Sequence, residues 1–241
     1  MTQPANLLLP KSLFVSPDRL TKASERWAML QAKLETARDV GVTFRTDIAS
    51  FEQSHGYGAH TPSYQNNCYA SAVGFLVTGD RTLHPGMIAP LFQDNRDGIL
   101  YGDAKNNIVP PYIAQNPDLF NQTFRQGLLA DGILDNIPID QAGHYVPLIG
   151  LTYYQKYKSD FHFIVPLKDG AFSDRQHRQG SIEYFANAQD MSNTYLGRDC
   201  LQADVYFAPK LYHGQKAVIT DASRARVNNI YHGASAAMFG G

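Results

Sequence analysis

The chain has 241 residues, of which 44% are hydrophobic, 12% aromatic and only 18% charged, and its formal net charge is −1. A disordered protein is excluded, because disorder requires high charge and few aromatic residues, and the length is sufficient to bury a core. The balanced charge argues against a nucleic-acid-binding protein, and no apolar run approaches the roughly 20 residues that cross a bilayer.

The first fifteen residues do not resemble a secretion signal. They contain Leu7-Leu8-Leu9, but Pro10 and Lys11 follow at once and no basic segment precedes them. We therefore expect a cytoplasmic protein, or one secreted without a signal peptide by a dedicated export machine. Two cysteines, Cys68 and Cys200, are too few for a disulfide framework, and a single disulfide between them is an open alternative.

A first helix is predicted from Ser16-Pro17-Asp18 to Gly41, because a capping side chain and a proline open it and a glycine ends it. One face carries apolar side chains at helical spacing, namely Leu20, Trp27, Leu30, Leu34 and Ala37. The opposite face, which we expect to be solvated, carries Lys22, Glu25, Arg26, Lys33 and Arg38.

The middle of the chain alternates irregular segments with two predicted helices. Residues 54–67 are irregular, a short helix fits residues 68–77, and residues 81–115 are rich in turns. The second helix begins at Asn116-Pro117-Asp118 and ends at Gly132, with apolar residues spaced four apart.

Strands follow in the second half. Residues 144–154 and 161–165 predict an antiparallel hairpin with its turn near Tyr157, and shorter strands fit residues 203–207 and 216–220. Helices first and strands later indicate an α+β fold. We expect a helical extension over residues 1–50, one domain over residues 51–232 and a flexible tail over residues 233–241.

Cys68 is the strongest candidate for chemistry, because it begins a predicted helix. A helix N-terminus stabilises a thiolate, and its free N–H groups can bind the oxyanion that forms when sulfur attacks a carbonyl. The neighbouring Gln65, Asn67 and Tyr69 are candidate oxyanion or substrate-binding residues. The alternative is a buried cysteine that acts as a small hydrophobic residue.

A thiol nucleophile needs a base, usually a histidine held by a third polar group. His144 follows Gly143 at the start of the first hairpin strand and is our candidate base. For the third member we favour His162, then Asp160, both on the partner strand, then Asp169 in the next turn, which the hairpin register puts roughly opposite His144.

This order, a cysteine on a helix, a histidine at a strand start and a polar residue on the next strand, resembles the papain-like thiol hydrolases. These include NlpC-type peptidases, bacteriocin-leader peptidases, transglutaminase-type enzymes and protein glutaminases. The resemblance implies a papain-like core in which N-terminal helices pack on an antiparallel sheet.

Short motifs over residues 64–175 resemble one bacterial group of such proteins more closely. They are Asn66 to Tyr69, Pro85-Gly86, Ala130-Asp131-Gly132, Gly143 to Val146, Asp160 to Phe163 and Asp169-Gly170. Two features depart from papain itself: Pro62 stands where papain has its oxyanion glutamine, and no tryptophan follows the third catalytic position.

The resulting hypothesis is a cysteine-dependent amide hydrolase acting on a peptide or peptidoglycan-like substrate, in the manner of an exported effector or toxin with a protein partner or immunity protein. Two alternatives stay open: a protein glutamine deamidase or transglutaminase-like enzyme, and a non-catalytic partner-binding protein. His55 and His60 precede Cys68 without a recognised metal-ligand spacing, so we expect no metal and no other cofactor.

Overall fold

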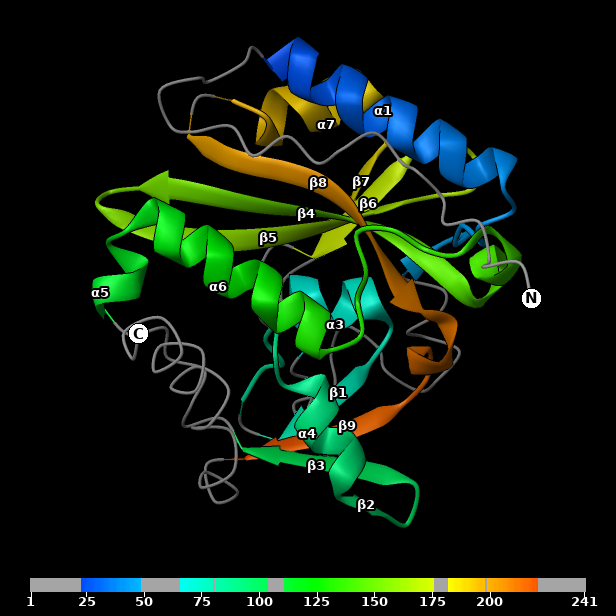
Figure 1. Ribbon diagram of the computed structural model, residues 1–241, viewed down its shortest axis with the longest axis vertical. Helices are drawn as coiled ribbons and strands as arrows, with labels where there is room; N and C mark the ends of the chain where they lie inside the picture. The colour runs from blue at the N-terminus through cyan, green and yellow to red at the C-terminus, as the bar shows by residue number, and fades with distance from the viewer. Residues whose placement is uncertain are drawn as a thin grey trace, which may run out of the picture.

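The structure, a computed structural model, describes residues 23–48, 66–79, 81–103, 111–175, 182–197 and 199–220. A five-stranded antiparallel sheet has the order β7-β6-β5-β4-β8, and a four-stranded mixed sheet has the order β1-β9-β3-β2 (Figure 1). Helices pack on the large antiparallel sheet, which confirms the expected α+β class. The small sheet, in which β9 lies parallel to both β1 and β3, was not predicted.

The strands are β1 (Leu76–Gly79), β2 (Asn95–Arg96), β3 (Ile99–Asp103), β4 (Tyr145–Gln155), β5 (Lys158–Pro166), β6 (Phe172–Arg175), β7 (Ile182–Phe185), β8 (Cys200–Pro209) and β9 (Lys216–Thr220). The α-helices are α1 (Ala23–Asp39), α3 (Cys68–Val73), α4 (Ile88–Gln93), α5 (Pro111–Ala114), α6 (Pro117–Ala130) and α7 (Ala188–Tyr195). Two 3₁₀-helices are η2 (Ile139–His144) and η3 (Lys210–Tyr212).

The large sheet separates two hydrophobic cores. Figure 1 shows α1 and α7 on one face and α3 and α6 on the other. Phe163, Val165 and Tyr206 belong to the core shared with α3, α6 and the small sheet. Ile149, Ile164 and Val205, which alternate with them along the strands, belong to the core under α1 and α7. Among the described residues, no helix is long and apolar enough to cross a membrane.

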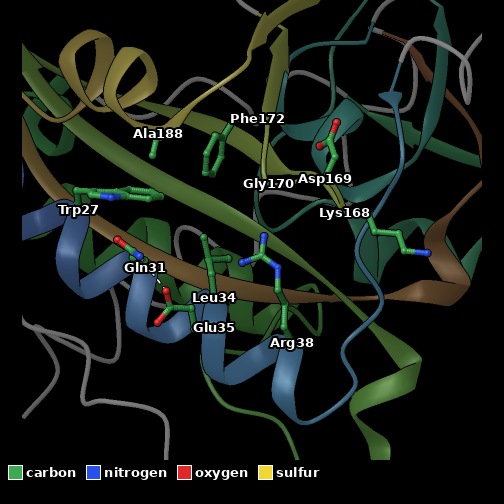
Figure 2. A pocket seen from close by; sticks show the side chains of 10 residues that line it. All are labelled: Trp27, Gln31, Leu34, Glu35, Arg38, Lys168, Asp169, Gly170, Phe172 and Ala188. Carbon is green, nitrogen blue, oxygen red and sulfur yellow. Dashed lines mark hydrogen bonds between the residues drawn. The ribbon is translucent and has the colours of Figure 1, made fainter.

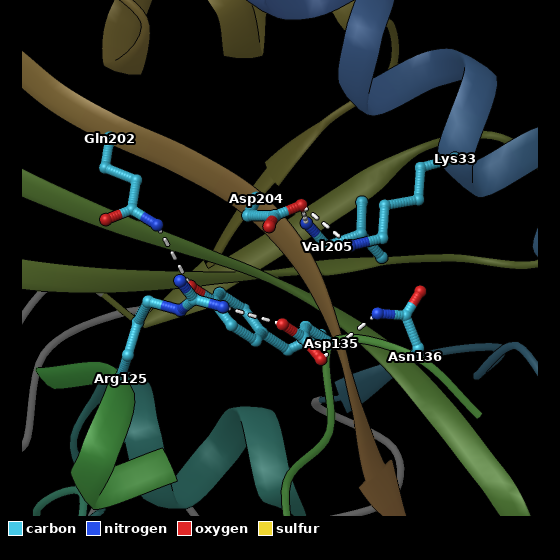
Figure 3. A network of polar contacts seen from close by, with 8 residues as sticks. Lys33, Arg125, Asp135, Asn136, Gln202, Asp204 and Val205 are labelled. Atoms are coloured by element: carbon cyan, nitrogen blue, oxygen red, sulfur yellow. Dashed lines mark hydrogen bonds and ion pairs between the residues drawn. The ribbon is translucent and has the colours of Figure 1, made fainter. Parts of the chain in front are cut away.

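Helix α1 confirms the predicted apolar face but only part of the solvated opposite face, on which Glu25 and Arg38 are exposed. Leu30, Leu34 and Ala37 are buried as expected, yet Arg26 and Lys33 are buried too. The Lys33 Nζ lies 2.8 Å from Asp204 Oδ1 on the edge strand β8 (Figure 3). Arg26 Nη1 donates to the Leu196 carbonyl at the end of α7, at 2.8 Å. Arg26 and Lys33 are buried because α1 lies against both β8 and α7, which helical periodicity cannot reveal.

The predicted β4–β5 hairpin is confirmed. Lys156 and Tyr157 form its turn, with φ of 50° and 64°, the left-handed backbone that a two-residue hairpin turn requires. The register pairs Tyr153 with Asp160 and Leu151 with His162. The predicted strands at 203–207 and 216–220 correspond to β8, which is longer, and β9.

The second predicted helix is confirmed as α6, whose first turn is capped by Asn116. The helix predicted over residues 68–77 ends earlier, at Val73, because Gly74 adopts a left-handed φ of 85° and β1 follows. Segment 81–115 also holds α4, α5, β2 and β3, where turns were expected. The start of the first predicted helix, residues 16–22, and the predicted tail lie outside the described residues.

Candidate active site

Cys68 is the first residue of α3, as the sequence predicted. The Asn67 side chain caps this helix by accepting a hydrogen bond from the Ala70 N–H at 3.0 Å. At the other end, the Arg45 guanidinium donates to the carbonyls of Ser71 and Ala72, both at 2.6 Å. Caps at both ends fix the helix, so the Cys68 side chain, 8% exposed, has a defined position.

His162 on β5 contacts both Cys68 and Asp174. Its Nε2 lies 2.7 Å from Oδ2 of Asp174, which lies on the neighbouring strand β6. Ile164 pairs with Asp174, so His162, two residues from Ile164, starts from their face of the sheet, the face that α7 covers, and its ring still reaches Cys68 at the first turn of α3. Burial lowers the pKa of His162, but hydrogen bonds to Asp174 and Cys68 and the charges of both groups outweigh it and raise the pKa to about 10. The geometry therefore favours an imidazolium between a carboxylate and a sulfur.

Two hydrogen-bonding groups at this cluster are unused. The backbone N–H of Cys68 donates to no group in the described part of the chain. Asp174 is 1% exposed, and its Oδ1 accepts no hydrogen bond there. Within the described residues, this N–H next to the sulfur is open to an incoming oxygen atom.

The structure does not bring His144 to Cys68. His144 is exposed at the end of η2, just before β4 begins. On β4, the residue that pairs with His162 is Leu151. The strand from Tyr145, which follows His144, to Leu151 extends about 20 Å at the usual rise of roughly 3.3 Å per residue, so His144 lies far along the strand from His162. The histidine that the structure places beside Cys68 is therefore His162 and not His144.

Neither predicted carboxylate contacts His162. Asp160 is exposed, and its carboxylate accepts from the next backbone N–H, of Phe161, at 2.8 Å. Asp169 lies in the turn before β6, where it accepts from Ala171 N–H and Tyr184 Oη. The carboxylate that reaches His162 is Asp174, which our sequence reasoning missed. The alternation of side chains along β6 could have indicated that Asp174 and His162 share a face. That inference needed the pairing of β5 with β6, which the sequence does not give.

The predicted oxyanion and substrate-binding residues have structural contacts instead. The amide of Asn67 is occupied at both ends, since its Nδ2 donates to the Leu83 carbonyl at 2.8 Å in addition to the cap. Tyr69 is fully buried and its hydroxyl donates to Asp131 at 2.5 Å. Gln65 lies outside the described residues. Cys68 and Cys200 are both free thiols.

A second carboxylate, Asp131, organises the loop beside α3. Besides the Tyr69 hydroxyl, it accepts from the backbone N–H groups of Gly86, Ile88 and Ala89 at 2.6, 2.7 and 3.3 Å. Burial raises the pKa of Asp131 to about 7 against the opposing effect of these hydrogen bonds. The Asn-Asn-Cys-Tyr, Pro-Gly and Ala-Asp-Gly motifs of the sequence therefore meet at one buried contact.

A pocket of about 370 Å³ lies away from the cysteine, between α1, the turn before β6 and the start of α7 (Figure 2). Trp27 and Phe172 line it together with charged side chains from both sides, among them Arg38 and Asp169. Within the described ranges, no group of three or more His, Cys, Asp or Glu side chains is placed to hold a metal ion.

Compared with known protein families, curated proteins and solved structures, the chain matches none of them.

Proposed function

We propose that this protein is a cysteine-dependent amide hydrolase in which Cys68 is the nucleophile, His162 the acid–base residue and Asp174 the group that orients the imidazole. The observation that carries the proposal is the double contact of His162, with Asp174 on one side and Cys68 on the other. A nucleophile, a base and an orienting carboxylate in contact are the minimum set for acyl transfer by a thiol.

We further propose that α3 and the β4–β5–β6 strands form a papain-like core. The supporting features are the chain order and the local geometry: a cysteine that begins a helix, a histidine on a strand and a carboxylate on the next strand. The imidazole Nε2 is engaged by Asp174, which leaves Nδ1 as the nitrogen that serves the sulfur.

The chemistry follows from these contacts. The Cys68 thiolate attacks the carbonyl carbon, a C–S bond forms, and the oxygen becomes an oxyanion that the Cys68 N–H can stabilise. The His162 imidazolium then gives its proton to the amide nitrogen, the C–N bond breaks and the amine leaves. Water attacks the thioester while His162 takes its proton, the C–S bond breaks, the acid leaves, and the Cys68 thiolate and His162 imidazolium are restored.

The proposed substrates are peptides, peptidoglycan stems or side-chain amides, because all of them present a carbonyl bonded to nitrogen. A glutamine deamidase would use the same steps and release ammonia as the leaving amine. Ammonia release from protein glutamine therefore distinguishes that variant of the activity from cleavage of a backbone amide.

The test is the rate at which iodoacetamide alkylates Cys68 at pH 6, with Cys200→Ser in every variant. An ordinary thiol is almost wholly protonated at this pH. We expect ready alkylation in the parent and a roughly 100-fold slower rate in His162→Ala, because the imidazolium no longer stabilises the thiolate. The matched control is His144→Ala, which should react like the parent. Equal rates in His162→Ala and the parent would refute the proposal.

A further inference from the structure

Tyr195, the last residue of α7, contacts two members of the Cys68–His162–Asp174 cluster. Its hydroxyl donates a short hydrogen bond to Asp174 Oδ2, the same oxygen that lies against His162 Nε2. Its ring also stacks on the imidazole, with centroids 5.0 Å apart and planes 18° from parallel. We propose that Tyr195 is a positioning residue that holds Asp174 and His162 in their working geometry, an inference that rests on the proposed function.

Tyr195 is itself held in place from two sides. Arg26 of α1 donates from Nη1 to the carbonyls of Leu196 and Gly197, both at 2.8 Å, directly after the tyrosine. The Phe185 ring of β7 meets the Tyr195 ring edge-on, with centroids 5.8 Å apart. These contacts explain why Arg26 is buried: it satisfies the two carbonyls that follow α7 and so fixes the tyrosine.

The hydroxyl matters because of how Asp174 is bonded. Its Oδ1 accepts no hydrogen bond in the described part of the chain, so the carboxylate is oriented through Oδ2 alone. His162 and Tyr195 are the two donors on that oxygen. Without the tyrosine hydroxyl, His162 alone would hold the carboxylate, and a carboxylate that can rotate is a weaker partner for the imidazolium.

The other titratable groups around this cluster come from β4 and β8. Burial raises the pKa of Tyr153 on β4 well above its usual value, with smaller effects from Cys200, Tyr195, Asp174 and Cys68. Burial likewise raises the pKa of Cys200 to about 11. Both groups stay neutral near neutral pH, so the charges that Tyr195 acts on are those of Asp174, His162 and Cys68.

The experiment is the pH profile of Cys68 alkylation by iodoacetamide in full-length protein carrying Cys200→Ser. Tyr195→Phe keeps the ring and the stack but removes the hydroxyl. We expect its midpoint to move to higher pH by about one unit, the effect of losing one hydrogen bond to a charged group. Tyr195→Leu, which also loses the stack, should move it at least as far. The control is Tyr157→Phe in the hairpin turn, where the side chain is 85% exposed, and its midpoint should not move.

The outcomes separate this inference from the function it rests on. If His162→Ala leaves the midpoint unchanged, the proposed function fails whatever Tyr195 does. If His162→Ala raises the midpoint and Tyr195→Phe does not, the positioning role of the hydroxyl is overturned while the function stands. A merely structural tyrosine would lower the thermal unfolding temperature on substitution without moving the midpoint.

Discussion

Asp174 and Asp131 are both buried carboxylates near α3, and they differ in how their oxygens are used. Asp131 accepts four hydrogen bonds, from Tyr69 and three backbone N–H groups, spread over both oxygens. Asp174 uses one oxygen for His162 and Tyr195 and leaves the other without a donor.

The difference separates a carboxylate that holds the fold together from one that is placed to take part in a reaction. A fully bonded carboxylate that faces backbone groups can only hold them, because any movement costs several hydrogen bonds at once. A carboxylate that faces an imidazole controls a group able to carry a proton, and the proton can move while the backbone stays still. The comparison assigns Asp131 to the fold and Asp174 to the proposed reaction, and three predictions test that assignment.

The largest effect is expected for Asp131→Ala. The substitution removes the Asp131 acceptor from the buried Tyr69 hydroxyl and from the N–H groups of Gly86 and Ile88, and each lost buried hydrogen bond costs about 1–3 kcal/mol. We expect a loss of about 4 kcal/mol in the free energy of unfolding, measured by urea denaturation. Asp160→Ala is the control, because this exposed side chain bonds only to the adjacent N–H and should change stability by less than about 0.5 kcal/mol. A loss below 1 kcal/mol for Asp131→Ala would contradict the structural assignment.

A smaller effect, on reactivity, is expected for Asp174→Ala. Removing the carboxylate leaves the imidazolium without its partner, so alkylation of Cys68 at pH 6 should slow by about tenfold, since a hydrogen bond to a charged group contributes at least that much. Asp169→Ala is the matched control, because Asp169 lies in the preceding turn and contacts Ala171 and Tyr184 instead. Slower alkylation of Cys68 in Asp169→Ala, with no change in Asp174→Ala, would contradict the assignment of Asp174 to the proposed reaction.

The last prediction concerns the pH dependence of stability, which should fall through two adjoining windows. Burial raises the pKa of Asp131 from 3.8 to about 7. For His162, burial acts downward but the contacts with Asp174 and Cys68 prevail, and the pKa rises from 6.5 to about 10. A group whose pKa is raised on folding stabilises most below its unfolded pKa and loses that contribution as pH rises through its folded pKa. Stability should therefore fall between pH 3.8 and about 7 because of Asp131, and between pH 6.5 and about 10 because of His162.

Urea denaturation of the parent, Asp131→Asn and His162→Gln at pH 5, 7 and 9.5 separates the two windows. Asp131→Asn should abolish the decrease in the acidic window and keep the alkaline one, and His162→Gln should do the reverse. The same pH dependence in both variants would show that neither group is responsible.

Elements governed by neighbouring residues were predictable. Helix α6 begins at its cap Asn116, and the apolar spacing that predicts it lies within its own fourteen residues. The turn of the β4–β5 hairpin lies in the polar segment that separates the two predicted strands. This turn falls where the sequence predicted, at Lys156 and Tyr157, which fixes the pairing of Gln155 with Lys158. The sequence could not show that His162, and not His144, lies beside Cys68, because both histidines lie next to or within strand-forming sequence and only the position of α3 distinguishes them.

The sequence by itself determined the α+β class, the helix that begins at Cys68, and the hairpin that carries His162. These depend on caps, turn residues and periodicity, which act over a few residues. Only the tertiary structure decided that Asp174 reaches His162, that Asp131 joins three motifs, and that Arg26 and Lys33 are buried. Those contacts join residues from separate elements, and they exist only once the two sheets and α1 have packed, because a hydrogen bond depends on distances in space rather than along the chain.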